Sequence, residues 1–464
     1  GNAIIMLTIA GTIIWQSGFL LLQLAGLART DSNMGFFDGS FTNPGLMGGF
    51  LAISLSALIP FTVRKERHDW LWVTCILAIT MGLIALPATL SRASVLAFSA
   101  CLATWLIKRR QFRIAIGMAC MALAAGIYAY GMKKESADIR GYMAKACITL
   151  LSENNWKGYG PGSFPQQYAR YQMSHFASGR FTEKERLSAN VPTNCCNELI
   201  ESGMEYGLPF MLTVLALAIW VIYRGIRQGV PWSYPLMAWA VFSLFSYPTV
   251  SFMLRYLGAL SLAGTVTGIC NGPESSTTSM GIRKTIALTL PCGLVACACI
   301  TAGNLEWTRQ RIAATREFGI GQIWYDQGDF RTSVRNWERI SQHMDHSSAF
   351  LFQYGVALNQ VRQYRKSDSI LHVCEQLSMD PMIRIIMGDN ALAMNDMELA
   401  EACYRQSFLT VPNRITPLAR LADLYHLKGD SARYAGIVEE MKSFIPKIDN
   451  HTVRSIRNGY IGDN

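Results

Sequence analysis

Long uncharged runs dominate this chain up to about residue 304 and limit the folds open to it. Half of the residues are hydrophobic and only 16% are charged, a balance too apolar for an ordinary soluble protein. A helix needs about 20 apolar residues to cross a bilayer. We count nine candidate spans, at residues 3–27, 44–62, 69–88, 90–107, 112–131, 204–223, 232–250, 252–270 and 284–303.

Short basic loops between these spans predict their orientation, because Lys and Arg are enriched in cytoplasmic loops. Four such clusters occur, at Arg64–Arg67, Lys108–Arg113, Arg224–Arg227 and Arg283–Lys284. Placing all four in the cytoplasm puts residues 132–203, and everything after residue 303, on the opposite, periplasmic side. Much of the net charge of +10 lies in these loops, so we do not expect the protein to bind nucleic acid.

The region after residue 303 carries a repeat. Turn signals recur at Gly328, Arg362, Asn395 and Gly429, which are 34, 33 and 34 residues apart. A period of 34 with paired amphipathic helices is typical of tetratricopeptide repeats, which stack into a solenoid, and a generic helical domain is the alternative. We predict a transmembrane domain over residues 1–303, with a periplasmic loop at 132–203, and a periplasmic tetratricopeptide-like domain over residues 304–464.

Polar side chains gather on the predicted periplasmic side of the membrane region. The stretch VPTNCCNELIESGMEYGLPF, residues 191–210, sets three carboxylates directly against an apolar run. Arginines are unexpected on this side, because the positive-inside rule keeps them scarce there. Arg92, Arg140, Arg170 and Arg255 occur there nonetheless. Guanidinium groups bind phosphate oxygens through two bonds, so the set suits a diphosphate headgroup. For Arg92 and Arg255, an anchor that snorkels to the membrane surface is the alternative.

The order of the motifs resembles the O-antigen ligase and polymerase superfamily of integral membrane glycosyltransferases. An FTNPGLMGGFLA span, an LSRAS turn, an R-x4-K helix and a GYGPGSF turn precede CNELIESGMEYGL, over roughly residues 40–270. The resemblance implies a GT-C-like bundle in the bacterial inner membrane, surrounded by membrane lipid. It also implies an undecaprenyl-diphosphate-linked glycan donor and no metal ion or other cofactor. The expected fold is thus all-α, with a polytopic transmembrane helical bundle followed by an α-solenoid.

The resemblance also implies roles for individual residues. Arg92 matches the family's Ser-Arg turn and Arg140 matches the arginine that opens the periplasmic helix, so both would bind the donor diphosphate. Arg170 and Arg255 are further candidates for this binding. The glycines of the GYGPGSF turn permit a tight backbone turn, and exposed amides there could instead cradle an anion.

The family's general base is in question, because its His-Asn pair reads Cys196-Asn197 here, with Glu205 eight residues further on. A carboxylate can accept the proton of an acceptor hydroxyl, which makes Glu198 the first candidate for the base and His175 the second. We predict catalytic roles for Glu198, for Asn197 beside it, and for Arg92 and Arg140. An unperturbed thiol has a pKa near 8.5, so Cys196 is a poor base. We assign Cys196, Glu205 and His175 to the acceptor side, and helix-end structure is the alternative for Glu205.

The acceptor remains open between lipid A core, a growing polysaccharide chain in a polymerase, and a protein. The predicted solenoid favours an acceptor or partner that is itself a protein, because solenoids present concave surfaces to peptides. A transporter of the lipid-linked glycan is an alternative from another class, although charges at mid-span would then be expected. A membrane scaffold is a further alternative, but it leaves the arginines and residues 132–203 without a role.

Overall fold

The computed structural model describes residues 2–28, 37–41, 43–64, 69–117, 134–270 and 305–461. Every regular element in these ranges is an α-helix or a short 3-10 helix, which confirms the predicted all-α class. The predicted spans 112–131 and 284–303 lie partly or wholly outside these ranges. The predicted domain boundary at residue 303 also lies outside them.

The helices form two compact units. The first comprises Gly1–Arg140, Leu151–Gly160 and Asn194–Leu288. The second comprises Gly141–Leu150, Pro161–Thr193 and Thr289–Asn464. A large part of the predicted periplasmic loop therefore belongs with the C-terminal region.

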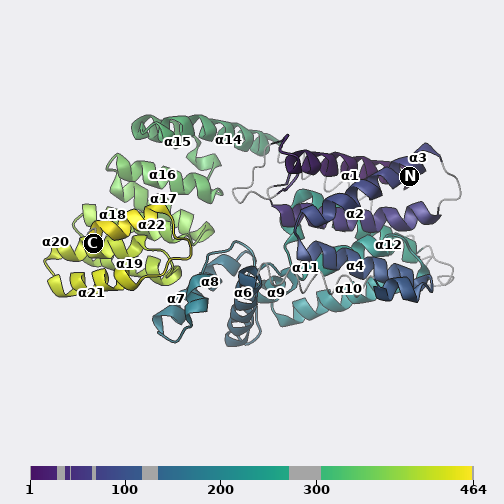
Figure 1. The fold of residues 1–464 in the computed structure, drawn as a ribbon. Coiled ribbons are helices and arrows are strands. Elements are labelled where there is room, and N and C mark those ends of the chain that lie inside the picture. The colour runs from purple at the N-terminus through teal and green to yellow at the C-terminus, as the bar shows by residue number, and fades with distance from the viewer. Residues whose placement is uncertain are drawn as a thin grey trace. The chain divides into compact units, whose positions relative to one another are not determined.

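The first unit contains the apolar helices (Figure 1). They and their short connecting helices are α1 (Asn2–Leu24), α2 (Pro44–Arg64), α3 (Trp70–Ala88), α4 (Arg92–Lys108), α9 (Glu198–Tyr206), α10 (Leu208–Gln228), α11 (Ser233–Ser243), η1 (Pro248–Val250) and α12 (Phe252–Cys270). Five of the helices that the structure describes are long and apolar enough to cross a membrane, namely α1, α2, α3, α10 and α12. At 17 residues, α4 is slightly shorter.

Two predicted spans have different bounds in the structure. The span predicted at 232–250 is α11, of only 11 residues, followed by the 3-10 helix η1. Pro248 accounts for the interruption, because proline lacks the N–H that a helix requires and the residue before it avoids helical angles. The span predicted at 204–223 starts later, at Leu208, because Gly207 takes φ 94° and separates α9 from α10.

Helix α2 lies at the centre of the first unit, where it packs against α1, α3, α4, α11 and α12. Its side chains Met47, Phe50 and Leu51 are fully buried in the core. A Cβ at Gly48 would lie 2.6 Å from Ser94 Oγ and 2.8 Å from Thr89 Oγ1, so only glycine allows α2 to approach this turn so closely. The first turns of α2 are thereby packed against the start of α4.

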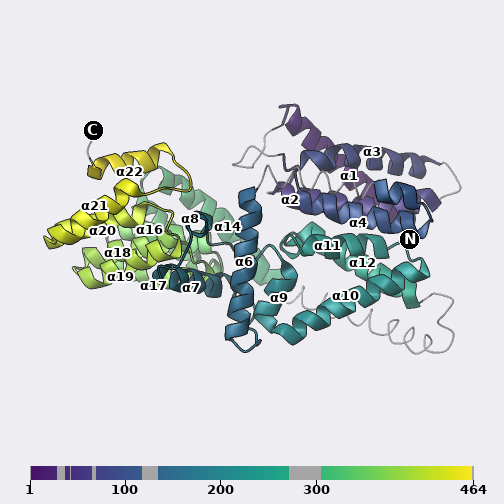
Figure 2. The same cartoon turned by 60° about the horizontal axis from the view of Figure 1, so that its bottom comes forward.

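The second unit contains the helices after residue 304, which we call the C-terminal array. They are α14 (Leu305–Asp326), α15 (Phe330–Ile340), η2 (Ser341–His343), α16 (Ser348–Gln360), α17 (Tyr364–Leu377), α18 (Pro381–Ala393), α19 (Met397–Thr410), α20 (Thr416–Lys428), α21 (Ser431–Ser443) and α22 (His451–Ile461). Consecutive helices pack as antiparallel pairs that follow one another along the array (Figure 2). Helices α7 (Phe164–Ala177) and α8 (Glu183–Ser188) belong to the same unit, and α6 (Lys134–Glu153) contributes to both units.

The predicted repeat recurs as geometry in the C-terminal array. One of the first two residues after the first helix of each pair has a left-handed backbone, with φ 81° at Gly328, 64° at Arg362, 67° at Asn395 and 70° at Gly429. Close helix contacts repeat with the same spacing, because Gly321, Gly355 and Gly388 face Trp337, Leu371 and Tyr404, respectively. The helix pairs and their period are therefore present, while assignment to the tetratricopeptide family stays a prediction.

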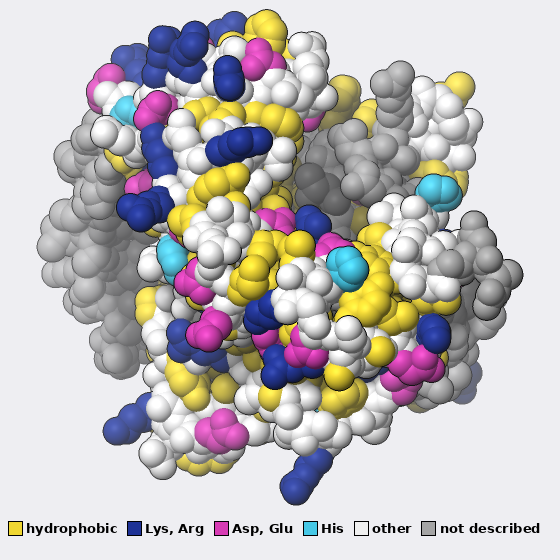
Figure 3. Space-filling view, turned by 90° about the vertical axis from the view of Figure 1, so that its left-hand side faces the viewer, with side chains coloured by type: hydrophobic (Ala, Val, Ile, Leu, Met, Phe, Trp, Pro, Cys, Tyr) yellow, Lys and Arg dark blue, Asp and Glu magenta, His cyan; other side chains and the backbone are white. Residues whose placement is uncertain are grey.

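The surface of the C-terminal array mixes charges of both signs with hydrophobic side chains (Figure 3). Glu401, for example, forms ion pairs with Arg405, Lys428 and Arg433. Burial alone would raise the pKa of Glu401, but hydrogen bonds from these neighbours and from Tyr425 lower it to about 2. Interspersed charges of this kind are typical of a water-exposed surface.

Candidate active site

The start of α9 is fixed by its own polar side chains. Asn197 caps the helix, because its Oδ1 accepts the backbone N–H of Ile200 at 3.0 Å. Before it, Cys196 adopts a left-handed backbone with φ 57°. The Glu201 carboxylate accepts the N–H of Cys195 at 2.9 Å, which ties this turn to the first turn of the helix. Asn197 and Glu201 thus serve the local structure, and the role predicted for Asn197 in catalysis stays a prediction.

The end of α9 is held by the glycine turn that sequence analysis singled out. The amides of Tyr159 and Gly160 donate to the carbonyl oxygens of Met204 and Glu205, each at 2.9 Å. A Cβ at Gly158 would lie 2.1 Å from the Glu205 carbonyl oxygen, so this backbone approach requires glycine. Because these two amides are bonded to α9, they are not available for the anion cradle considered for this turn.

Glu198 is the first residue of α9 and is half-buried. Its Oε1 accepts the backbone N–H of Thr249 at 2.6 Å and also the Thr249 hydroxyl. Burial raises the pKa of Glu198 to about 7, against the opposing effect of both Thr249 hydrogen bonds, and nearby Glu201 raises it further. Within the described part of the chain, no hydrogen-bond donor reaches Oε2. This oxygen can therefore accept a proton from a substrate near neutral pH.

Arg140 lies beside this turn. Its Nη1 donates to the carbonyl oxygen of Phe245 at 3.2 Å, in the connection between α11 and η1. Burial raises the pKa of the Cys196 thiol, and the positive charge of Arg140 partly opposes this effect. Arg140 acts in the same way on the pKa of Tyr247, which burial also raises. Arg140, Cys196 and Tyr247 are thus neighbours, although they are far apart in sequence.

The N-terminal end of α2 connects this cluster with the Ser-Arg turn. Asn43, just before α2, donates through Nδ2 to the hydroxyl of Tyr247 at 2.8 Å. Gly48, one turn into α2, packs against Thr89 and Ser94. Arg92, half-buried at the start of α4, lies between those two residues in sequence. The predicted residues Arg92, Arg140 and Glu198 therefore come from elements that meet around one end of α2.

The other predicted residues lie on α12 and α7. Arg255 is in the first turn of α12 and its side chain is exposed. Arg170 and His175 lie on α7, in the second unit. The His175 ring stacks on Tyr171 with a centroid separation of 5.8 Å, and its Nε2 is 3.7 Å from Glu185 Oε2. Of the two candidates for the general base, Glu198 belongs to the same unit as Arg140, and His175 belongs to the second unit.

A pocket of about 580 Å3 opens beside α9. Its polar part is lined by the carboxylates of Glu198, Glu201 and Glu205, so Glu205 faces the same space as the other two. Its apolar part lies between α10 and α11 and is lined by Leu215, Ile219, Ile222, Met237, Val241 and Leu244. Such a pocket suits an amphiphilic ligand whose apolar chain lies beside the carboxylates.

Sequence reasoning did not identify Thr249 or Tyr247 as part of the site. Both fall within the stretch predicted as a continuous span, 232–250, where polar side chains would face lipid. The dipeptide Tyr247-Pro248 was the available signal, because a proline inside an apolar run favours a break. Such a break allows the following residues to reach toward α9.

Comparison with known proteins found one family match. The sequence family described as O-antigen ligase matches residues 76–209, which include Arg92, Arg140 and the whole of α9. A search of curated proteins found no match. Over those residues the chain is therefore similar to O-antigen ligases, and its five long apolar helices suggest a multi-pass membrane protein.

Proposed function

We propose that this protein transfers a glycan from an undecaprenyl-diphosphate-linked donor to an acceptor hydroxyl at the periplasmic membrane face. The observation that carries the proposal is the environment of Glu198. Its carboxylate is half-buried, has a pKa raised to about 7, and is oriented by Thr249 at the polar part of an apolar pocket. A general base works best when its pKa is close to the pH at which the enzyme operates.

The donor would bind with its diphosphate near Arg140 and Arg92. Both side chains are half-buried at the end of the first unit where α9 lies, and guanidinium groups form paired hydrogen bonds with phosphate oxygens. The apolar space between α10 and α11 would receive part of the polyprenyl chain. Support for this comes from α10 itself, whose outward side chains Leu212, Leu217 and Trp220 are exposed, as expected beside lipid.

The reaction would proceed by direct displacement. Glu198 Oε2 accepts the proton of the acceptor hydroxyl while the hydroxyl oxygen attacks the anomeric carbon of the donor sugar. The bond between that carbon and the phosphate oxygen breaks on the opposite face, so the configuration inverts and undecaprenyl diphosphate leaves. Negative charge develops on the leaving phosphate, and Arg92 and Arg140 stabilise it.

The acceptor would be a lipid A core, a protein or a growing polysaccharide. The water-exposed C-terminal array favours a protein, since arrays of helix pairs offer extended surfaces for peptides. This preference follows from architecture, whereas the assignment of Glu198 follows from the site. The two can be tested separately.

A deletion strain tests the function. We expect the strain to lose a surface glycan or a set of glycoproteins and to accumulate the lipid-linked donor. The wild-type gene should restore the product, and a gene carrying Glu198→Gln should not. Loss of glycoproteins with unchanged surface polysaccharide would identify a protein acceptor, and loss of long polysaccharide chains alone would identify a polymerase. Unchanged glycans of both kinds would contradict the proposal.

Thr249 provides a test of how the base is tuned. Replacing it with valine removes the hydroxyl that stabilises the ionised Glu198, so the pKa of Glu198 should rise above its present value of about 7. Since the base must be deprotonated, the acid limb of kcat/KM should move to higher pH by about one unit. Thr213→Val is the control, because that hydroxyl bonds only to the carbonyl oxygen of Pro209 within α10. An acid limb that stays in place would show that another group titrates.

A further inference from the structure

The connection between α11 and α12 is attached to two parts of the candidate active site. Phe245, near its start, accepts a hydrogen bond from Arg140 through its carbonyl oxygen. Thr249, near its end, donates two hydrogen bonds to Glu198. Tyr247 lies midway between these two residues in sequence. Its side chain therefore extends from a segment that is bound to the proposed base and to an arginine proposed to bind the donor.

The hydroxyl of Tyr247 accepts a hydrogen bond from Asn43. Asn43 Nδ2 donates to the hydroxyl oxygen at 2.8 Å. The orientation of this amide is fixed, because Asn43 Oδ1 accepts the backbone N–H of Gly45 at 2.7 Å. The hydroxyl can therefore only accept from Asn43, and its own proton points elsewhere. Within the described part of the chain, no acceptor is bonded to this proton.

The loop before Asn43 is itself bound to α1, through two buried glutamines. Gln23 Oε1 accepts the backbone N–H groups of residues 38 and 39, at 3.2 and 2.9 Å. Gln16 Oε1 accepts the N–H of Ser40 at 3.1 Å, and its Nε2 donates to the Ser40 hydroxyl at 2.6 Å. These contacts all lie within the first unit, as do Asn43 and Tyr247. The amide that orients the Tyr247 hydroxyl is thus carried by a segment with fixed neighbours.

Tyr247 lies where a ligand of Arg140 could reach it. The ring of Tyr247 packs against the hydrophobic core of the first unit, and the residue as a whole is only half-buried. The positive charge of Arg140 acts on the Tyr247 hydroxyl and on the Cys196 thiol, so the three groups are neighbours. An oriented O–H beside a guanidinium offers a neutral and a charged donor together, which suits the several oxygens of a diphosphate.

We propose that Tyr247 is a further catalytic residue, whose hydroxyl donates a hydrogen bond to a phosphate oxygen of the leaving diphosphate beside Arg140. Asn43 is its positioning residue, because the amide donates to the hydroxyl oxygen and leaves the O–H to the ligand. This role rests on the proposed function, in which a diphosphate leaves. No proton is transferred to the phosphate. The hydrogen bond strengthens as negative charge develops on the phosphate oxygen, so it stabilises the transition state more than the bound donor.

Tyr247→Phe tests the hydroxyl, because phenylalanine keeps the ring and loses only the O–H. Tyr223→Phe is the matched control, since it removes the hydroxyl of an exposed tyrosine near the end of α10 that is remote from α9. The purified full-length protein is assayed for kcat with the lipid-linked donor. Binding of undecaprenyl diphosphate is measured separately, without turnover. A diphosphate beside Arg140 raises the pKa of the Cys196 thiol and should slow its alkylation by iodoacetamide, which mass spectrometry can follow.

We expect Tyr247→Phe to lower kcat by about 10- to 10²-fold and to weaken undecaprenyl diphosphate binding by about tenfold, as for loss of a hydrogen bond to a charged group. Tyr223→Phe should match the wild type in both. The role requires both changes, so a wild-type value of either one in Tyr247→Phe would overturn it and leave the proposed function intact. If undecaprenyl diphosphate did not slow alkylation in the wild type, both the donor site of the proposed function and the role of Tyr247 would be contradicted.

Asn43→Asp tests the positioning and also serves if Tyr247→Phe does not accumulate. Aspartate still accepts the N–H of Gly45, but it presents an oxygen to Tyr247, so the hydroxyl turns to donate to the new carboxylate. We expect kcat to fall by about tenfold or more although the hydroxyl is still present. In the Tyr247→Phe background the same change should cost less, because only the effect of the added charge remains. An equal loss in both backgrounds, or no loss in either, would overturn the role of Asn43.

Discussion

Glu198→Gln is expected to lower kcat by about 10²- to 10⁴-fold, the usual contribution of a general base. Glutamine keeps the length of the side chain and can still accept the hydrogen bonds of Thr249, so the start of α9 should remain in place. What it loses is the ability to take a proton from the acceptor hydroxyl. The measurement is transfer from purified lipid-linked donor by protein in detergent or vesicles, compared at equal amounts of folded enzyme.

The pH dependence of the wild type should agree with this loss. Burial raises the pKa of Glu198 to about 7, so below that pH most of the carboxyl is protonated and cannot act as a base. Activity should therefore rise with pH through about 7 and then level off. In Glu198→Gln the residual activity should lack this acid limb. A variant that keeps the limb would show that a different group is responsible for it.

Cys196→Ser is the comparison that isolates the carboxylate. Cys196 occupies the position where the resembling family has histidine, and burial raises the pKa of its thiol, so it is mostly protonated at neutral pH. Serine is similar in size and is no base at neutral pH, so most activity should remain. The opposite pattern, with Cys196→Ser inactive and Glu198→Gln active, would assign proton transfer to the thiol. Full activity in both would leave catalysis to the arginines and to substrate positioning.

The helices and their period were predictable from the sequence because both depend on local patterns. Uninterrupted apolar length is enough to predict α1, α2, α3 and α12, and turn residues 34 or 33 apart predict the pairs of the C-terminal array. The prediction of one span at 232–250 was wrong because the proline within it was overlooked. Pro248 ends what looked like one span, and the short α11 that results brings Thr249 to Glu198.

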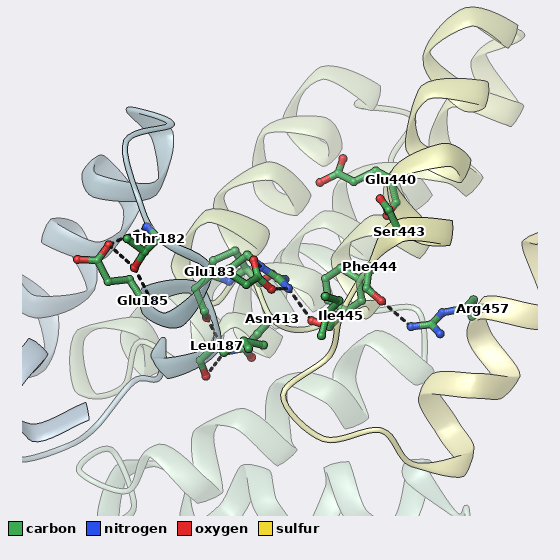
Figure 4. A network of polar contacts seen from close by, with 12 residues as sticks. Thr182, Glu183, Glu185, Leu187, Asn413, Glu440, Ser443, Phe444, Ile445 and Arg457 are labelled. Atoms are coloured by element: carbon green, nitrogen blue, oxygen red, sulfur yellow. Dashed lines mark hydrogen bonds and ion pairs between the residues drawn. The ribbon is translucent and has the colours of Figure 1, made fainter. Parts of the chain in front are cut away.

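The composition of the site was predictable only in part. Glu198, Arg92 and Arg140 stand out because charges at a membrane edge are unusual. Their partners Thr249 and Tyr247 do not stand out in the sequence. Only the fold shows that Thr249 contacts Glu198 and that Tyr247 lies near Arg140. The same holds for Asn413 and Arg186, which are in contact although more than two hundred residues of chain separate them (Figure 4). Contacts of this range depend on tertiary packing, which no local pattern encodes.

Arg140→Ala is expected to lower kcat on the order of 10²- to 10³-fold, as when one group that stabilises transition-state charge is removed. The effect should fall on kcat more than on KM for the donor, because the charge on the leaving phosphate grows as the sugar transfers. Arg140→Lys should recover little of the loss, since lysine keeps the charge but cannot form the two-point contact with phosphate oxygens. The same assay as for Glu198→Gln provides the measurement.

Two controls make the result for Arg140 specific. Arg227→Ala removes an exposed arginine at the end of α10 and should leave transfer unchanged. Alkylation of Cys196 reports on the site without any substrate. Arg140 lowers the pKa of that thiol, so in Arg140→Ala the pKa should rise, the thiolate fraction should fall and alkylation should slow at a given pH. Slower alkylation together with normal transfer would place Arg140 beside the turn but outside the donor site. The loss of its charge would then change the pKa of Cys196 without changing the stabilisation of the leaving diphosphate.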